Sequence, residues 1–187
     1  MLQPGAASFS FGRIIRHAFM EPHVLRVYIE DQLLEVRQRG ELVNSYPVST
    51  SMFGTGNDEG SNKTPLGTFE ISEKYGEGHP WNTIFKGRKP TGNWTDEGSF
   101  QEDDLILGRI LRLSGLEPDN KNTFQRFIYI HGTNHENTIG SATSHGCIRM
   151  RRGDVAALYE IIPIGTRVYI SATRPSSSPG NAQTVSH

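Results

Sequence analysis

Cys147 is the single cysteine among 187 residues, and it follows His145 and Gly146 in a Ser-His-Gly-Cys run. A second histidine, His131, ends an apolar run 16 residues before the cysteine. A cysteine attacks as its thiolate, and with a pKa of about 8.5 only a few per cent is ionised near neutral pH. An imidazole that takes the thiol proton removes this limit. The pair predicts a cysteine nucleophile with His131 as its base, provided that the intervening loop folds back.

The neighbours of this pair predict how it is held. Gly146 permits a sharp backbone turn beside the thiol. The backbone N–H groups of His145, Gly146 and Cys147 are then candidate donors for an oxyanion hole. Gly132 has no side chain that can orient the imidazole of the preceding residue. A backbone carbonyl or a neighbour such as Ser144 must therefore fix its tautomer.

Two other interpretations of these residues stay open on the sequence alone. A lone cysteine is most often a small buried apolar side chain, although such a cysteine rarely needs His-Gly before it. A zinc site is the second alternative, because His131, His135, His145 and Cys147 have spacings that suit Zn²⁺. No cysteine pair and no His-Glu-x-x-His helix supports it, so we predict no metal and no cofactor.

The composition is that of a soluble globular chain. Its 19 Lys and Arg against 20 Asp and Glu give a net charge of -1, and 35% of the residues are hydrophobic. A nucleic-acid-binding protein usually has a basic excess, and no stretch approaches the roughly 18 apolar residues of a membrane span. No secretory signal is visible, because Arg13 and Arg16 follow the mild apolar patch at the start. We expect a monomer that binds no nucleic acid and does not span a membrane.

Alternating apolar residues and many turn residues predict a β-rich fold. The expected strands are 24–30, 32–38, 41–50, 64–75, 126–132 and 166–171. The segment 102–116 fits either a short helix or a strand. The segment 152–162 fits a helix that is capped by Asp154 and has an apolar face of Val155, Leu158, Tyr159 and Ile162.

The domain organisation follows from composition. Residues 1–22 are expected to be an N-terminal arm, 23–173 the folded domain and 174–187 a disordered C-terminal tail. The segment 76–98 is rich in Gly, Pro and Lys and holds both tryptophans, Trp81 and Trp94. We expect a long loop there, either a lid over the site or surface packing.

The motif resembles the signature of the L,D-transpeptidase family, of the YkuD type. That signature is a histidine followed at a distance by Ser/Thr-His-Gly-Cys and a hydrophobic residue, and here it is His131 and then 144–148. Further blocks are similar to family blocks and stand in the family's order. They are 46–51, 64–71 and 165–170, so that the resemblance covers about residues 24–171.

The resemblance implies a mostly β fold with minor α. It would be a β-sandwich or mixed-sheet catalytic domain with one helix after the catalytic cysteine loop. Cys147 would be the nucleophile and His131 the general base, oriented by the Gly132 carbonyl. His145 and Gly146 would form the oxyanion loop and line the site, and Ser144 would support that loop.

The implied substrate is a peptidoglycan stem tetrapeptide, whose third residue is typically meso-diaminopimelate. The cysteine would attack the carbonyl of that residue and release D-alanine, leaving a thioester. An amine of another stem, a lipoprotein lysine, a D-amino acid or water would then resolve it. Arg149, Tyr129 and Thr133 would bind the substrate, with the Arg149 fork on a carboxylate.

The family also implies carbapenem-type β-lactams as covalent inhibitors, and a periplasmic or cell-envelope location, although no signal peptide is visible. Two alternatives remain beside the transpeptidase. Water as the acceptor would make the protein an L,D-carboxypeptidase or amidase. A cell-wall-binding module without catalysis would carry an unreactive Cys147.

Overall fold

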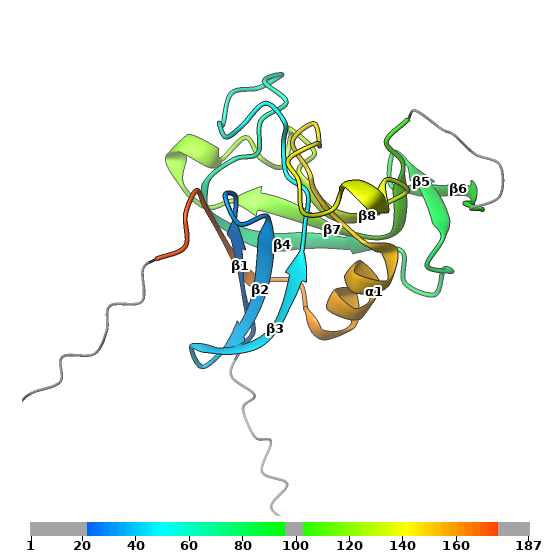
Figure 1. Cartoon of the computed structure of the whole chain (residues 1–187), viewed down its shortest axis with the longest axis horizontal. Helices are drawn as coiled ribbons and strands as arrows, with labels where there is room; N and C mark the ends of the chain where they lie inside the picture. The colour runs from blue at the N-terminus through cyan, green and yellow to red at the C-terminus, as the bar shows by residue number, and fades with distance from the viewer. Residues whose placement is uncertain (1–21, 96–102, 176–187) are drawn as a thin grey trace, which may run out of the picture.

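The computed structural model describes residues 22–95 and 103–175, and Figure 1 shows their arrangement. The strands are β1 (Val24–Tyr28), β2 (Leu33–Gln38), β3 (Glu41–Pro47), β4 (Gly67–Tyr75), β5 (Thr83–Lys86), β6 (Lys89–Asn93), β7 (Ile106–Gly115), β8 (Tyr129–Thr133), β9 (Ile148–Met150) and β10 (Arg167–Ser171). One α-helix, α1 (Arg152–Ile161), and two short 3-10 helices, Pro118–Asn120 and Glu136–Thr138, complete the described residues. The chain is therefore mostly β with minor α, as predicted. The predicted arm 1–22 and tail 174–187 lie outside the described residues, except for residues 22, 174 and 175.

The strands form one mixed sheet. Hydrogen bonds link them in the order β3-β2-β1-β10-β4-β7-β5-β6, and β8 pairs with both β7 and β9. The pairs β1/β10 and β8/β9 are parallel, whereas the other pairs are antiparallel. Ser49, just after β3, exchanges two backbone hydrogen bonds of 2.8 and 2.9 Å with Arg149 of β9. The hydrogen bonding consequently returns from β9 to the segment after β3, and the sheet closes on itself.

The main core fills the inside of this closed sheet. Alternate residues of β1 and β10 point inward, and Ile130 of β8 and Ile148 of β9 belong to the same buried cluster. The helix α1 lies against β7 and β8, as Figure 1 shows. Its predicted apolar face is confirmed, since Val155, Leu158, Tyr159 and Ile162 are all buried in this cluster. The core thus occupies one face of β8 and β9 and leaves their other face for a site.

The start of α1 corrects one expectation. Asp154 does not cap the helix but lies in its first turn, and the N-cap residue is Arg151. The carboxylate of Glu136 accepts hydrogen bonds of 2.8 Å from both the backbone N–H and the Nε of Arg152. A side chain from a distant loop therefore satisfies a free amide at the helix start. No helix of the described residues is long and apolar enough to cross a membrane.

The structure decides one segment that the sequence left ambiguous and corrects the expectation for another. The ambiguous segment 102–116 contains strand β7, because β4 and β8 hydrogen-bond to its two edges. The segment 76–98, expected to be a long loop, contains the β5–β6 hairpin, and β5 also pairs with β7. Its last residues, 96–98, lie outside the described residues. Trp94 is buried beside the hairpin, whereas Trp81 is exposed.

Candidate active site

The parallel pairing of β8 and β9 brings the predicted residues onto one face of the sheet. His131 lies opposite Arg149, and Ile130 lies opposite Ile148. Side chains alternate between the two faces of a strand, so His131 and Arg149 point away from the core that holds the two isoleucines. Cys147 directly precedes β9 and packs against a small cluster that includes Tyr129 of β8. The intervening loop therefore folds back, as the sequence analysis required.

The turn that carries the thiol is held by hydroxyl groups. Ser144 Oγ donates a hydrogen bond of 2.6 Å to the Cys147 carbonyl and accepts one of 3.2 Å from the Gly146 amide. Thr64 Oγ1, from the loop before β4, donates a hydrogen bond of 3.0 Å to the Gly146 carbonyl. Gly146 has a φ of +121°, a conformation that other residues rarely adopt. Because its amide is engaged by Ser144, Gly146 is no longer a free oxyanion donor, which leaves the His145 and Cys147 amides as candidates.

His131 is buried, and its ring has a defined orientation. Its Nδ1 lies 2.9 Å from the carbonyl oxygen of Gly132. A carbonyl only accepts, so Nδ1 carries the proton and Nε2 is the basic nitrogen. Burial lowers the pKa of His131, and the nearby Asp104 carboxylate opposes this shift. The imidazole is therefore neutral at neutral pH, the form that a general base needs.

Gly132 is required by close packing rather than by an unusual φ. A Cβ at this position would lie 2.5 Å from the Leu107 carbonyl oxygen on β7 and 3.2 Å from Val155 on α1. The neighbouring strand and the helix thus leave no room for a side chain directly after His131. The sequence analysis assigned Gly132 only one role, which was to orient His131 through its backbone carbonyl.

The surroundings of the Cys147 thiol favour its protonated form. Its Sγ lies 3.5 Å from the Phe127 carbonyl oxygen, to which it donates. Burial raises the pKa of the Cys147 thiol to about 11, although the Tyr129 backbone N–H and the Arg149 guanidinium act in the opposite direction. The raised pKa of Cys147 and the lowered pKa of His131 both disfavour a thiolate–imidazolium pair, the state with an ionised sulfur. A neutral imidazole is the form that can take the proton of a neutral thiol during attack.

Two residues around Tyr129 and Cys147, Phe127 and Arg88, were not predicted. Phe127 has a φ of +56°, a left-handed conformation that is uncommon for a non-glycine residue, and its ring is exposed. Arg88, at the tip of the β5–β6 hairpin, lies 5.2 Å from that ring and donates a hydrogen bond of 3.0 Å to the Tyr129 hydroxyl. The turn composition around Gly87 was the one available signal for this hairpin. The hairpin tip thus contacts the strand that carries His131.

The three predicted substrate-binding residues form a buried layer behind the site. Arg149 lies 3.2 Å from the Asp104 carboxylate and also donates to the Ser49 hydroxyl. Thr133 donates a hydrogen bond of 3.1 Å to the same carboxylate. Tyr129, Thr133 and Arg149 are all buried. Their burial and existing partners argue against direct contact with a substrate, and they fit the support of His131 and Cys147 instead.

The exposed residues near the thiol lie on the other side of its turn. His145 is exposed, and its ring centroid lies 5.6 Å from that of the exposed Phe53. A hollow of about 130 Å³ opens beside His145. It is lined by Glu59, Gly60, Asn62, Arg126, Ile128 and His145.

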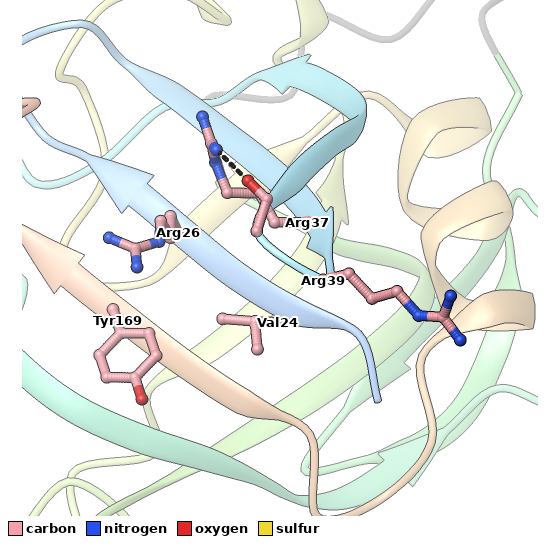
Figure 2. Close-up of a pocket in the computed structure, with 6 residues that line it drawn as sticks. Val24, Arg26, Arg37, Arg39 and Tyr169 are labelled. Atoms are coloured by element: carbon pink, nitrogen blue, oxygen red, sulfur yellow. Dashed lines mark hydrogen bonds between the residues drawn. The ribbon is translucent and has the colours of Figure 1, made fainter. Parts of the chain in front are cut away.

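A second hollow, of about 200 Å³, lies on different strands. Figure 2 shows Arg26, Arg37, Arg39 and Tyr169 around it, together with Val24. The Arg37 guanidinium bonds the Gly40 carbonyl at 2.7 Å. These residues belong to β1, β2, β10 and the turn after β2, none of which carries a predicted catalytic residue. This basic hollow is therefore not part of the candidate active site.

The zinc alternative finds no support in the geometry. Among residues 22–95 and 103–175, no three His, Cys, Asp or Glu side chains form a group that could hold a metal ion. His131 and Cys147 lie on one face of the sheet, whereas His145 is exposed at the turn.

Comparison with known proteins identifies relatives of this arrangement. A family model described as the L,D-transpeptidase catalytic domain, YkuD, matches residues 22–170. A Bacillus subtilis protein named "Putative L,D-transpeptidase YqjB" is 49% identical in an alignment of length 95, and the match covers 43% of this chain and 54% of that protein. The Bacillus licheniformis protein named "Putative L,D-transpeptidase YkuD" is 29% identical over 157 residues, or 84% of this chain and 70% of that protein. The match to the first of these spans about half of that protein's length.

Solved structures show the same fold. The structure of the LD transpeptidase LdtMt1 in complex with imipenem superposes with a TM-score of 0.52 at 18% identity. The match covers 81% of this chain and 59% of that chain. This likeness confirms the predicted fold class.

Proposed function

Because the chain belongs to the L,D-transpeptidase catalytic-domain family, we propose that it is a cysteine acyltransferase that acts on peptidoglycan stem peptides. The observation that carries the proposal is the placement of His131 and Cys147 on one face of β8 and β9, with the His131 ring fixed by Gly132. The family is one of transferases of cell-wall peptidoglycan. The roles of the individual residues are our proposal.

The first half-reaction forms a thioester. His131 Nε2 takes the proton of the Cys147 thiol as the sulfur attacks the carbonyl carbon of the third stem residue. The carbonyl oxygen becomes an oxyanion in the tetrahedral intermediate. When the intermediate collapses, the bond to D-alanine breaks, and the imidazolium returns the proton to the leaving amine. Covalent catalysis thus divides one difficult displacement into two easier ones.

The oxyanion is proposed to be held by backbone N–H groups of the cysteine turn. The His145 and Cys147 amides remain available, whereas the Gly146 amide already bonds Ser144 Oγ. Ser144 and Thr64 fix the carbonyls of this turn, which keeps its amides in place before the substrate arrives. Such preorganised donors stabilise developing charge without having to reorient.

The second half-reaction transfers the acyl group to an amine. The acceptor amine gives a proton to His131 as its nitrogen attacks the thioester carbon, and the Cys147 sulfur leaves and is reprotonated. An amine of a second stem gives a cross-link between the third residues of two stems. A lipoprotein lysine or a D-amino acid gives an attachment product, and water gives hydrolysis. The wall polymer as substrate places the protein in the periplasm or cell envelope.

The ion pair of Asp104 and the buried Arg149 is proposed to act through His131 and Cys147. The Asp104 carboxylate accepts a hydrogen bond from Thr133 and forms an ion pair with Arg149. Its charge also raises the pKa values of His131 and Cys147. This ion pair therefore positions the two reacting groups and sets their protonation, without touching the substrate.

The test is a product analysis with a purified disaccharide-tetrapeptide. Mass spectrometry is expected to show D-alanine release and cross-linked dimers with the wild-type chain and neither product with Cys147→Ala. Tripeptide alone identifies the hydrolase alternative. Imipenem is expected to add one acyl adduct to the wild-type mass, because it acylates a nucleophilic cysteine. A chain that forms no product and no adduct is the non-catalytic wall-binding module.

A further inference from the structure

The basic hollow lies on the outer face of β1, β2 and β10, away from the main core. Leu25 of β1 is buried in that core, so its neighbours Val24 and Arg26 point to the outer face. The strand register places Arg37 of β2 opposite Val24 and Tyr169 of β10 opposite Arg26. Residues that lie opposite each other on adjacent strands share a face of the sheet. Three neighbouring strands therefore build the hollow of about 200 Å³ that Figure 2 shows.

The charge of this hollow has one sign. Its lining contains Arg26, Arg37 and Arg39 and no acidic side chain. Glu35 is the acid nearest in register, since it lies opposite Arg26, but its carboxylate pairs with Arg37 at 2.7 Å and with Arg174 at 2.9 Å. Within residues 22–95 and 103–175, no acidic side chain forms an ion pair with Arg26 or Arg39. Two guanidinium charges thus lack a counter-charge, although the whole chain has a net charge of -1.

The two uncompensated charges are separated from each other. Figure 2 shows Arg26 and Arg39 on opposite sides of Val24. The Arg26 guanidinium lies 5.5 Å from the centre of the Tyr169 ring, over which it packs. Arg39 extends from the turn between β2 and β3 and has a left-handed φ of +55°. This arrangement suits a ligand that carries two anionic groups some distance apart.

The surface between the two charges is uncharged. It is formed by Val24 and by the ring of Tyr169, of which 39% is exposed. The volume of the hollow far exceeds the roughly 10–15 Å³ that one water needs, so a carbon-containing link fits over these side chains. A guanidinium binds phosphate oxygens bidentately. A phosphodiester carries its charge inside a chain, so that two successive phosphates can reach both arginines while the polyol or sugar between them covers Val24.

We propose that the basic hollow binds a phosphodiester-linked polyol or sugar polymer of the cell envelope. Successive phosphates lie at Arg26 and Arg39, and the uncharged link lies over Val24 and Tyr169. Only the choice of an envelope polymer rests on the proposed function. The hollow contains no residue of the candidate active site, so Cys147 stays free when the polymer is bound. Such binding would hold the enzyme on its wall between successive reactions.

The first test uses the unaltered protein and measures binding by isothermal titration calorimetry. The probe is poly(glycerol phosphate), and glycerol 1-phosphate and polygalacturonate are the comparisons. We expect the polymer to bind at least about tenfold more tightly than the monomer, because linked phosphates occupy both ends at once. We also expect its affinity to fall as salt is added. Equal binding of polygalacturonate overturns the phosphate preference, and no binding of the polymer overturns the site.

A membrane surface and a nucleic acid also present phosphates, and two further probes distinguish them. Vesicles that contain phosphatidylglycerol and a single-stranded DNA oligonucleotide are expected to bind at least about tenfold more weakly than poly(glycerol phosphate). Tighter binding of the vesicles would assign the hollow to a lipid surface. Tighter binding of the oligonucleotide would assign it to nucleic acid. Either result overturns the proposed polymer.

The second test locates the binding. The double variant Arg26→Gln/Arg39→Gln is expected to bind poly(glycerol phosphate) at least about tenfold more weakly than the wild type. Arg151→Gln, an exposed arginine at the start of α1, is the matched control for the loss of a positive charge and is expected to stay within about twofold. Circular dichroism checks the fold of each variant. An equal loss in the double variant and the control would show attraction by net charge alone and overturn the site.

The outcomes separate this inference from the proposed function. The double variant is expected to form the imipenem adduct and to release D-alanine from a free tetrapeptide at the wild-type rate, since neither small molecule needs the hollow. Cys147→Ala is expected to bind poly(glycerol phosphate) as tightly as the wild type. An adduct without polymer binding removes the basic hollow as a site and leaves the acyltransferase. Polymer binding without adduct or turnover removes the acyltransferase and leaves the phosphate site.

Discussion

Ser144 Oγ donates a hydrogen bond of 2.6 Å to the carbonyl oxygen of Cys147, three residues later, and so closes the turn that presents the thiol. The same hydroxyl accepts from the Gly146 amide. Ser144→Ala leaves both buried groups without this partner, which costs about 1–3 kcal/mol of unfolding free energy. We expect a matching loss in chemical denaturation and a slower acylation. Ser141→Ala, at an exposed position in the preceding loop, serves as the control, and an equal loss in both variants would remove the special role of Ser144.

Cys147→Ala is expected to abolish D-alanine release and the imipenem adduct without unfolding the chain. The thiol packs at the edge of a small cluster and is not part of the main core, so its loss creates little cavity. Intact-mass spectrometry measures the adduct, and circular dichroism checks the fold. Turnover near the wild-type rate in this variant would exclude the cysteine from the reaction.

His131→Ala is expected to lower the acylation rate by roughly 10²–10⁴-fold, the usual contribution of a general base. The protonated thiol cannot ionise readily on its own, since burial raises its pKa to about 11. Single-turnover acylation by imipenem measures the step directly. His23→Ala, ahead of β1, is the control and is expected to keep the wild-type rate. A His131→Ala rate within a few-fold of wild type would show that another group removes the proton.

The pH dependence follows from the two shifted groups. Burial lowers the pKa of His131, so the basic imidazole persists below the ordinary histidine range. Acylation should therefore rise from acid pH, level off before about pH 6.5 and show no second rise near the ordinary thiol pKa of about 8.5. Iodoacetamide alkylation of Cys147 in His131→Ala should instead keep increasing above pH 9 toward the thiol pKa of about 11. An alkylation midpoint near pH 7 in the wild-type protein would indicate a resting thiolate and contradict the neutral pair.

Asp104→Asn is expected to make the thiol more acidic. The Asp104 carboxylate raises the pKa values of Cys147 and His131, so its neutralisation lowers both and moves the alkylation midpoint to lower pH. The same change leaves the buried Arg149 guanidinium without its charge partner, which destabilises the fold by up to about 3–5 kcal/mol. Asp103→Asn, at the exposed neighbouring position, controls for surface charge. A shift of the midpoint to higher pH would contradict this electrostatic account.

The strands, and the proximity of His131 and Cys147 on one face of the sheet, were predictable because their signals are local. The alternation in 24–30 and the apolar run before His131 are patterns that few other structures produce, and the Ser-His-Gly-Cys run is specific. The segment 102–116 stayed ambiguous because β7 is buried on both edges by β4 and β8, and only those partners decide that it is a strand. The β5–β6 hairpin was missed because its Gly, Pro and Lys content masks the pairing with β7.

The environment of each side chain was not predictable, since it depends on contacts between distant segments. Asp154 has the right residue type for a cap, yet Glu136 from another loop performs the capping of α1. Arg149 has the right chemistry for a substrate carboxylate, yet Asp104 lies beside it and the sheet buries it. Arg126 carries no motif at all, and its position beside Cys147 appears only when the loop 56–63 folds around it.

The pairing of Ser49 with Arg149 leaves β9 with a partner on each side, so the segment that follows the nucleophile has no free edge. Such a strand cannot peel away alone, because two ladders would have to break together. The amide protons of β9 should thus exchange with solvent only when the entire molecule opens. Heating or denaturant would then abolish the reactivity of Cys147 and unfold the sheet in one transition. No partly unfolded form would keep the rest of the sheet while the cysteine segment is unfolded.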